Sequence, residues 1–192
     1  MKVPKGRKEI VAAYGNPSKD GNPAFAKAMA GQLDTVWLKE QTILMELPYP
    51  MRLAWKLETV VTRCRVHKKV APVLREALEQ VWNAARLAVK KRDGFDKTTA
   101  YYDAATLKYL RDFGLDLFGG VFAFRLMRAG SRLSTHSWGI AIDIDPKHNA
   151  LGTPGRMPRW VVRIFEDIGF IWGGRWKASR CDPMHFQLCS GY

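Results

Sequence analysis

Residues 134–143 read Ser-Thr-His-Ser-Trp-Gly-Ile-Ala-Ile-Asp, a turn followed by an alternating apolar segment. Alternation over residues 140–144 predicts a short strand with the isoleucines on one face and Ala141 and Asp143 on the other. A turn at residues 137–139 can bring His136 back towards Asp143. This stretch therefore predicts two potential metal ligands on one side of a small sheet.

A second segment, Asp182-Pro183-Met184-His185, follows some forty residues later. Residues 184–188 predict another strand, on which His185 and Gln187 share a face. A catalytic zinc site needs three protein ligands, an open position for water and a nearby base. His136, Asp143 and His185 supply imidazole and carboxylate ligands that suit Zn²⁺, and Asp182 supplies a carboxylate that can act as general base.

A lone Asp or His in a strand is more often a hydrogen-bonded structural group than a metal ligand. We therefore expect His67 and His148 to be hydrogen-bonded structural groups. We expect Asp145 to be a loop carboxylate or one that supports a metal ligand. The combination of His136, Asp143 and His185 is much harder to explain in this way.

The rest of the chain predicts an α+β fold, in which a small, mainly antiparallel sheet carries the zinc site and packs against helices. Apolar spacing predicts a long helix over residues 67–91 and shorter ones over 98–113 and 158–168. Further strands are expected at 121–125 and, as short extended segments around Pro48-Tyr-Pro50, at 36–46 and 51–55. We expect one domain over residues 1–192, with a loosely packed N-terminal arm (1–30) that contains one short helix at 9–14, and a zinc-site core (119–190).

The chain has a net charge of +13, which makes a polyanionic partner plausible. Nucleic acid, an anionic cell wall and a membrane surface all fit charge alone, but no nucleic-acid-binding motif is present. No apolar run approaches the roughly 20 residues that span a bilayer. The basic N-terminus lacks the apolar core of a signal peptide, so we expect synthesis in the cytoplasm. The three cysteines lack a pairing pattern and predict no disulfide framework.

The pattern S-x-H-x-x-G-x-A-x-D, followed by D-x-x-H, resembles the M15 family of zinc peptidases. The resemblance is strongest over residues 119–190, and it implies an M15/hedgehog-like peptidase fold. It implies that His136, Asp143 and His185 bind one Zn²⁺ and that Asp182 is the general base. It also implies an arginine that binds the substrate or its developing oxyanion; Arg125 is the best match and Arg132 the reserve. Trp172 and Trp176 are candidates for the walls of the substrate cleft.

The resemblance implies hydrolysis of an amide bond in the stem peptide of peptidoglycan. Similarity to the endolysin-like branch favours an L-alanyl-D-glutamate endopeptidase of the phage type, acting on the cell wall after release from the cytoplasm. The alternatives are a D-alanyl-D-alanine carboxypeptidase in wall remodelling and a basic binding protein with a structural zinc. Anionic cell-wall polymers or lipopolysaccharide are possible further partners of the positive charge.

Overall fold

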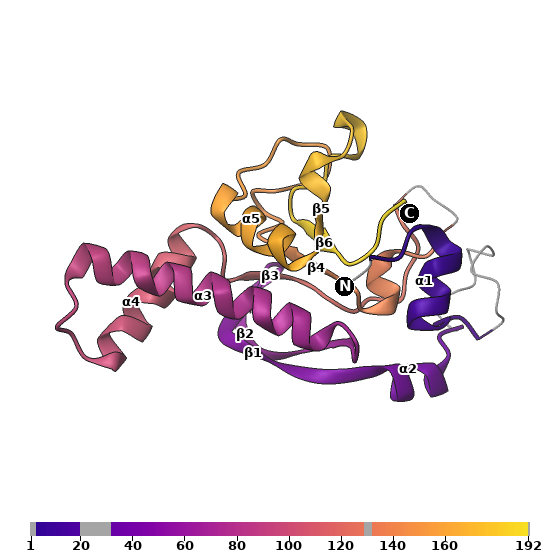
Figure 1. The fold of residues 1–192 in the computed structure, drawn as a ribbon, viewed down its shortest axis with the longest axis horizontal. Coiled ribbons are helices and arrows are strands. Elements are labelled where there is room, and N and C mark those ends of the chain that lie inside the picture. Colours follow the sequence, from indigo (N-terminus) through magenta and orange to yellow (C-terminus); the bar gives the residue numbers. More distant parts are fainter. Residues whose placement is uncertain (1–2, 20–31, 129–131, 192) are drawn as a thin grey trace.

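The computed structural model describes residues 3–19, 32–128 and 132–191, and these form an α+β structure built on one six-stranded sheet (Figure 1). The sheet order is β2-β1-β3-β4-β6-β5. All neighbouring strands are antiparallel except the parallel pair β1 and β3. The strands are β1 (Thr42–Leu53), β2 (Lys56–His67), β3 (Leu117–Gly120), β4 (Ala141–Ile144), β5 (Ile171–Trp172) and β6 (His185–Gln187). The predicted α+β class and mainly antiparallel sheet are confirmed.

The described helices are α1 (Gly6–Tyr14), α2 (Thr35–Gln41), α3 (Ala71–Asp93), α4 (Thr99–Asp112) and α5 (Arg159–Ile168). The helices predicted over 67–91, 98–113 and 158–168 correspond to α3, α4 and α5. Helix α3 buries its apolar stripe, with Leu74, Leu78 and Val81 at most 1% exposed. Thr98 caps α4 by accepting a hydrogen bond from the Tyr101 backbone N–H. In Figure 1, α3 runs alongside the β1–β2 hairpin, and α5 lies near β5 and β6.

The segment before the first strand differs from the prediction. Residues 35–41 form α2 rather than an extended segment, because the Asp34 side chain accepts hydrogen bonds from the Val36 and Trp37 backbone N–H groups. Strand β1 then continues through both prolines. Its register with β2 shifts between Glu46 and Met51, and this irregularity accommodates residues that cannot donate to the ladder. Its partner β2 was not predicted.

The prediction of a strand at residues 121–125 is also wrong, because strand β3 spans Leu117–Gly120 and ends before this segment. The chain then leaves the sheet and bonds to the 3₁₀ turn η2 (Thr135–Trp138). The Ala123 N–H donates to the His136 carbonyl oxygen at 3.1 Å, and the Val121 carbonyl accepts from the His136 ring at 2.9 Å. These residues thus support the histidine instead of extending the sheet.

Within residues 3–19, the N-terminal arm is packed rather than loose. Ile10 is 0% exposed and Tyr14 is 3% exposed, and both belong to the main core. The Tyr14 hydroxyl donates to the Leu188 carbonyl oxygen at 3.0 Å, and the Gly6 N–H donates to the Ser190 carbonyl oxygen at 2.7 Å. The arm is packed because α1 places Ile10 and Tyr14 in the core, whereas the composition of residues 1–30 predicted loose packing. The remainder of the arm, residues 20–30, lies outside the described residues.

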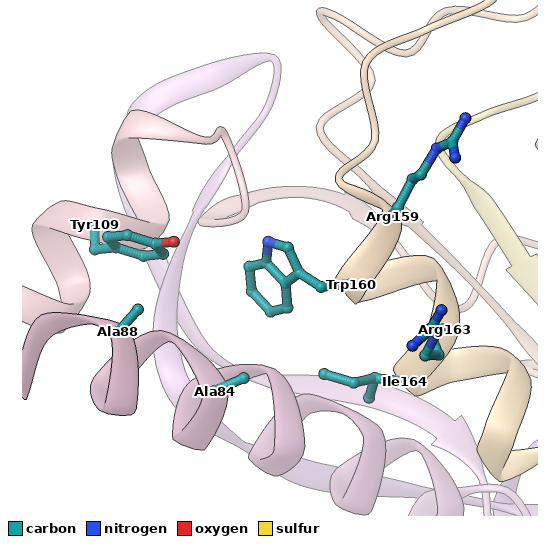
Figure 2. A pocket seen from close by; sticks show the side chains of 7 residues that line it. All are labelled: Ala84, Ala88, Tyr109, Arg159, Trp160, Arg163 and Ile164. Carbon is teal, nitrogen blue, oxygen red and sulfur yellow. The ribbon is translucent and has the colours of Figure 1, made fainter. Parts of the chain in front are cut away.

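One pocket, of about 590 Å³, lies where α3, α4 and α5 meet (Figure 2). Trp160 and Ile164 of α5, Tyr109 of α4 and Ala84 and Ala88 of α3 line it. The described residues around it include no histidine, cysteine or carboxylate, so it lacks the groups for metal chemistry. In the part of the chain that is described, no helix combines the length and apolarity needed to cross a membrane.

Candidate metal centre

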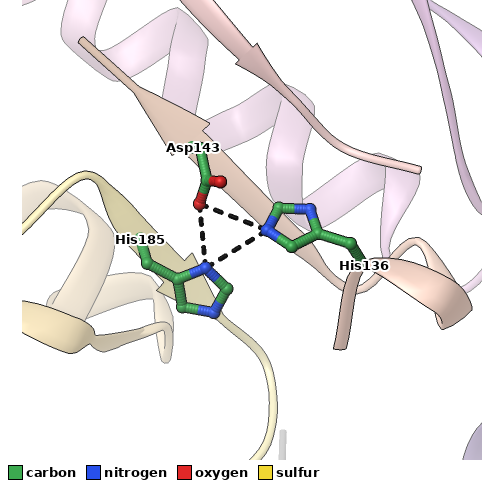
Figure 3. Close-up of side chains that lie close together, drawn as sticks. All are labelled: His136, Asp143 and His185. Atoms are coloured by element: carbon green, nitrogen blue, oxygen red, sulfur yellow. Dashed lines mark hydrogen bonds and ion pairs between the residues drawn. The ribbon is translucent and has the colours of Figure 1, made fainter. Parts of the chain in front are cut away.

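Strands β4 and β6 bring two of the predicted ligands together. Their antiparallel register pairs Asp143 directly with His185, so the two side chains project from neighbouring positions on the same face of the sheet (Figure 3). Gly119 on β3 packs against Asp143: a Cβ at Gly119 would lie 2.7 Å from the Asp143 Cβ. The absence of a side chain at this position therefore leaves room for the aspartate.

The 3₁₀ turn η2 delivers the third predicted ligand, His136. The Ser134 side chain caps the turn by accepting from the His136 N–H at 3.4 Å. Gly139 ends the turn with a left-handed φ of 65°. A Cβ at Gly139 would lie 2.9 Å from the backbone nitrogen of His67 on β2, so this position requires glycine for both conformation and space.

The three side chains converge on one point (Figure 3). The His185 Nδ1 atom is 2.8 Å from Asp143 Oδ1, and His136 Nε2 is 3.2 Å from the same oxygen. The two ring nitrogens are 3.2 Å apart. His136 and His185 are buried, at 3% and 6% exposure. Burial alone would raise the pKa of Asp143, but the two imidazoles outweigh it and hold that pKa well below its usual range.

Hydrogen bonds on the far side of each ring determine which nitrogen faces this point. His136 Nδ1 lies 2.9 Å from the Val121 carbonyl oxygen, which can only accept, so in the neutral ring Nε2 carries the lone pair. His185 Nε2 lies 3.0 Å from Gln187 Oε1. The Gln187 amide is itself oriented by donation to the Cys189 carbonyl oxygen at 2.9 Å. In the neutral ring, His185 therefore presents the lone pair of Nδ1; in the protonated ring, Nδ1 donates to Asp143.

Two nitrogen lone pairs and a carboxylate oxygen thus face one another within a buried site. With both rings neutral, a cation held between these three atoms would interact favourably with each of them. Tetrahedral ligands at about 2.0–2.1 Å from zinc lie roughly 3.3 Å apart, close to the separations found here. The donor set and its spacing fit a metal ion, and one side of the group remains open to a cleft.

Gln187 supports the proposed ligand His185, and its replacement provides a test. Gln187→Leu removes the nearer of the two oxygens beside His185 Nε2 and leaves only Thr135 Oγ1 at 3.3 Å, so we expect zinc affinity to fall by about 10- to 100-fold. Competition against a chromophoric chelator measures this change. Gln80→Leu, an exposed change on α3, serves as the control and should leave affinity unchanged. Equal affinities in the two variants would contradict the support assigned to Gln187.

Asp182 lies at the same cleft, just before β6. Its Oδ1 atom is buried and has no hydrogen-bond partner among the described residues. Burial raises the pKa of this carboxyl; Asp143 raises it further, whereas His185, His136 and Arg128 lower it. A half-buried carboxylate with one unpartnered oxygen and a raised pKa is well suited to accept a proton from a water molecule.

The cleft itself has a volume of about 740 Å³, and the three converging residues and Asp182 all line it. Arg125 is an exposed residue of its wall, and its Nη1 donates to the Leu126 carbonyl oxygen at 3.2 Å. Trp176 also lines the cleft and contacts the His185 ring at 5.5 Å between centroids. Trp172, the other predicted wall residue, instead stacks on Phe186 and donates from Nε1 to the Pro183 carbonyl oxygen at 2.8 Å.

Several residues of the cleft were not predicted from the sequence. Trp55 comes from the β1–β2 turn, whereas Thr135, Arg128 and Arg180 lie close to the motif in sequence. Strand alternation placed Gln187 on the same face as His185, but its contact with the His185 ring was not predicted. No local signal indicates Trp55, because the distant β1–β3 pairing brings it to the site.

The residues assigned structural roles lie in other networks. Asp145 is 1% exposed and bonds to His148 Nδ1 at 2.7 Å and to Asn149 Nδ2 at 3.0 Å. His67 is fully buried and bonds through Nε2 to the Tyr14 carbonyl oxygen at 3.1 Å. Burial lowers the pKa of His67 to about 4, consistent with a neutral core histidine. The three cysteines are free.

A buried His–Asp–His group beside a free carboxylate defines the class of site found in metal-dependent hydrolases. Residues 128–188, which contain all four of these residues, match the model of an M15 peptidase family described as D-alanyl-D-alanine carboxypeptidase. The predicted M15 resemblance is therefore confirmed for this segment. No curated protein and no solved structure gives a significant match to the chain.

Proposed function

We propose that this protein is a zinc-dependent peptidase that cleaves the stem peptide of bacterial peptidoglycan, with the L-alanyl-D-glutamate bond as its target. The observation that carries the proposal is the convergence of His136, Asp143 and His185 beside the unpartnered carboxylate of Asp182. The M15 match over the same segment supports peptidoglycan as the substrate class. A phage-type lytic role, after release from the cytoplasm, fits this activity and the net charge of +13.

In this proposal His136, Asp143 and His185 hold the zinc ion. When bound, zinc supplies electrophilic polarisation and makes water more acidic. Asp182 accepts a proton from the attacking water and then delivers it to the departing amine nitrogen. Arg125 contributes a positive charge at the cleft wall, where it can bind a substrate carboxylate or stabilise the developing oxyanion. Trp176 packs against His185 and helps to exclude bulk water from that ligand.

A D-alanyl-D-alanine carboxypeptidase is the second candidate function. The observation in its favour is the description of the matching family model, which names this activity. Both reactions use the same groups to attack an amide carbonyl, so they differ only in which part of the stem peptide occupies the cleft. A binding protein with a structural zinc is less consistent with the free carboxylate of Asp182.

Mass spectrometry of products from purified peptidoglycan separates these candidates. We expect fragments with a new N-terminal D-glutamate and no early release of D-alanine. Release of free D-alanine without new D-glutamate termini would instead establish the carboxypeptidase. Intact peptidoglycan after prolonged incubation with zinc-loaded protein would contradict both activities.

A further inference from the structure

Trp55 is an exposed tryptophan at the edge of the candidate catalytic cleft. It lies in the two-residue turn between β1 and β2, and 68% of it is exposed. It lines the same cleft as His136, Asp143 and His185, although it is distant from them in sequence. An aromatic surface that remains uncovered at the wall of a polar site is available to a ligand.

The turn that carries Trp55 is firmly attached to the strand beside the ligands. The Ala54 N–H donates to the Phe118 carbonyl oxygen at 3.1 Å. Arg52 forms a bidentate pair with Asp116, whose side chain is 5% exposed, at 2.6 and 3.1 Å. Gly119, which follows Phe118, packs against Asp143. The backbone that carries Trp55 is thereby held in a defined position relative to the candidate metal centre, which reduces the entropic cost of using this residue for binding.

The cleft lining also includes three arginines. Arg125 and Arg128 are exposed, and Arg180 also lines the cleft. A ligand that matches both features combines carboxylates with a flat, partly apolar surface. In peptidoglycan, the stem peptide provides the carboxylates, but its residues are small or charged. The sugar rings of the glycan provide the flat surface, because their C–H groups complement the negative face of an indole.

We infer that Trp55 forms a sugar subsite, which binds the glycan residue that carries the stem peptide. This inference rests on the proposed function and deepens it. The L-alanyl-D-glutamate bond lies near the sugar, whereas the D-alanyl-D-alanine bond lies at the far end of the stem. A sugar subsite within the cleft therefore favours the endopeptidase over the carboxypeptidase.

The test compares two substrates with the zinc-loaded protein: a disaccharide-linked stem peptide and the free peptide of the same sequence. For Trp55→Ala we expect kcat/KM on the linked substrate to fall about tenfold, mainly through KM, and by less than about twofold on the free peptide. Trp55→Phe should recover part of the loss. Leu57→Ala is the matched control, because Leu57 is 46% exposed on the same hairpin and does not line the cleft.

Equal losses on the two substrates, or no loss on either, would overturn the sugar subsite. Calorimetric titration with the disaccharide alone provides a readout that needs no catalysis. Binding to the wild type that is weakened in Trp55→Ala is the expected result, and equal binding or no binding would overturn the inference. If the wild type cleaves neither substrate, the proposed function fails, while the titration still decides the subsite.

Discussion

Replacing Asp182 by asparagine should lower the rate of stem-peptide hydrolysis by about a thousandfold, while the zinc content of the protein stays the same. Asn has nearly the same shape as Asp but cannot accept the proton of the attacking water. Because the carboxylate Oδ1 has no hydrogen-bond partner among the described residues, the change removes a proton acceptor without breaking a hydrogen bond between that atom and those residues. Single-turnover kinetics on the stem peptide, with metal analysis of the same sample, measures both quantities.

Asp167→Asn is the matched control for this prediction, because Asp167 is an exposed carboxylate on α5 and does not line the cleft. Its rate should equal that of the wild type. An Asp182→Asn variant that keeps the wild-type rate would exclude Asp182 as the base. Loss of zinc together with loss of activity would show instead that Asp182 supports the metal.

Replacing His136 by alanine should lower zinc affinity by more than about a hundredfold, beyond what loss of a supporting residue costs, and should abolish hydrolysis. His136 is one of only three donors that converge in the described group, so its removal leaves too few protein ligands for a tight site. Equilibrium dialysis against buffered zinc measures the affinity. Circular dichroism checks that the variant retains its helices and sheet.

His148→Ala is the control, since His148 bonds to Asp145 outside the converging group. Asp143→Asn is an independent second variant, which keeps the side-chain shape but removes the ligand charge. Both His136→Ala and Asp143→Asn should lose zinc, whereas His148→Ala should retain it. Normal zinc binding by folded His136→Ala would contradict the ligand set.

Local patterns were sufficient to predict much of the site. Alternation placed Asp143 opposite the isoleucines of its strand, and the structure pairs it with His185 across the ladder. The helices α3 and α4 were similarly predictable, because each pattern depends on residues a few positions apart.

The features that were missed depend on distant contacts. Strand β1 passes through Pro48 and Pro50, which local reasoning treats as breakers, and its register shift with β2 accommodates them. Residues 121–125 have strand-like composition but bond to η2 instead of the sheet. Trp55 reaches the cleft only because β1 pairs with β3, a contact that no short window of sequence reveals.

The most direct measurement of the central claim is hydrolysis of purified peptidoglycan before and after removal of the metal. Protein stripped with a chelator and then freed of it should release no stem-peptide fragments, and addition of Zn²⁺ should restore their release. The same addition to His136→Ala should restore nothing. Undiminished cleavage by the fully stripped wild-type protein would contradict a metal-dependent peptidase at His136, Asp143 and His185.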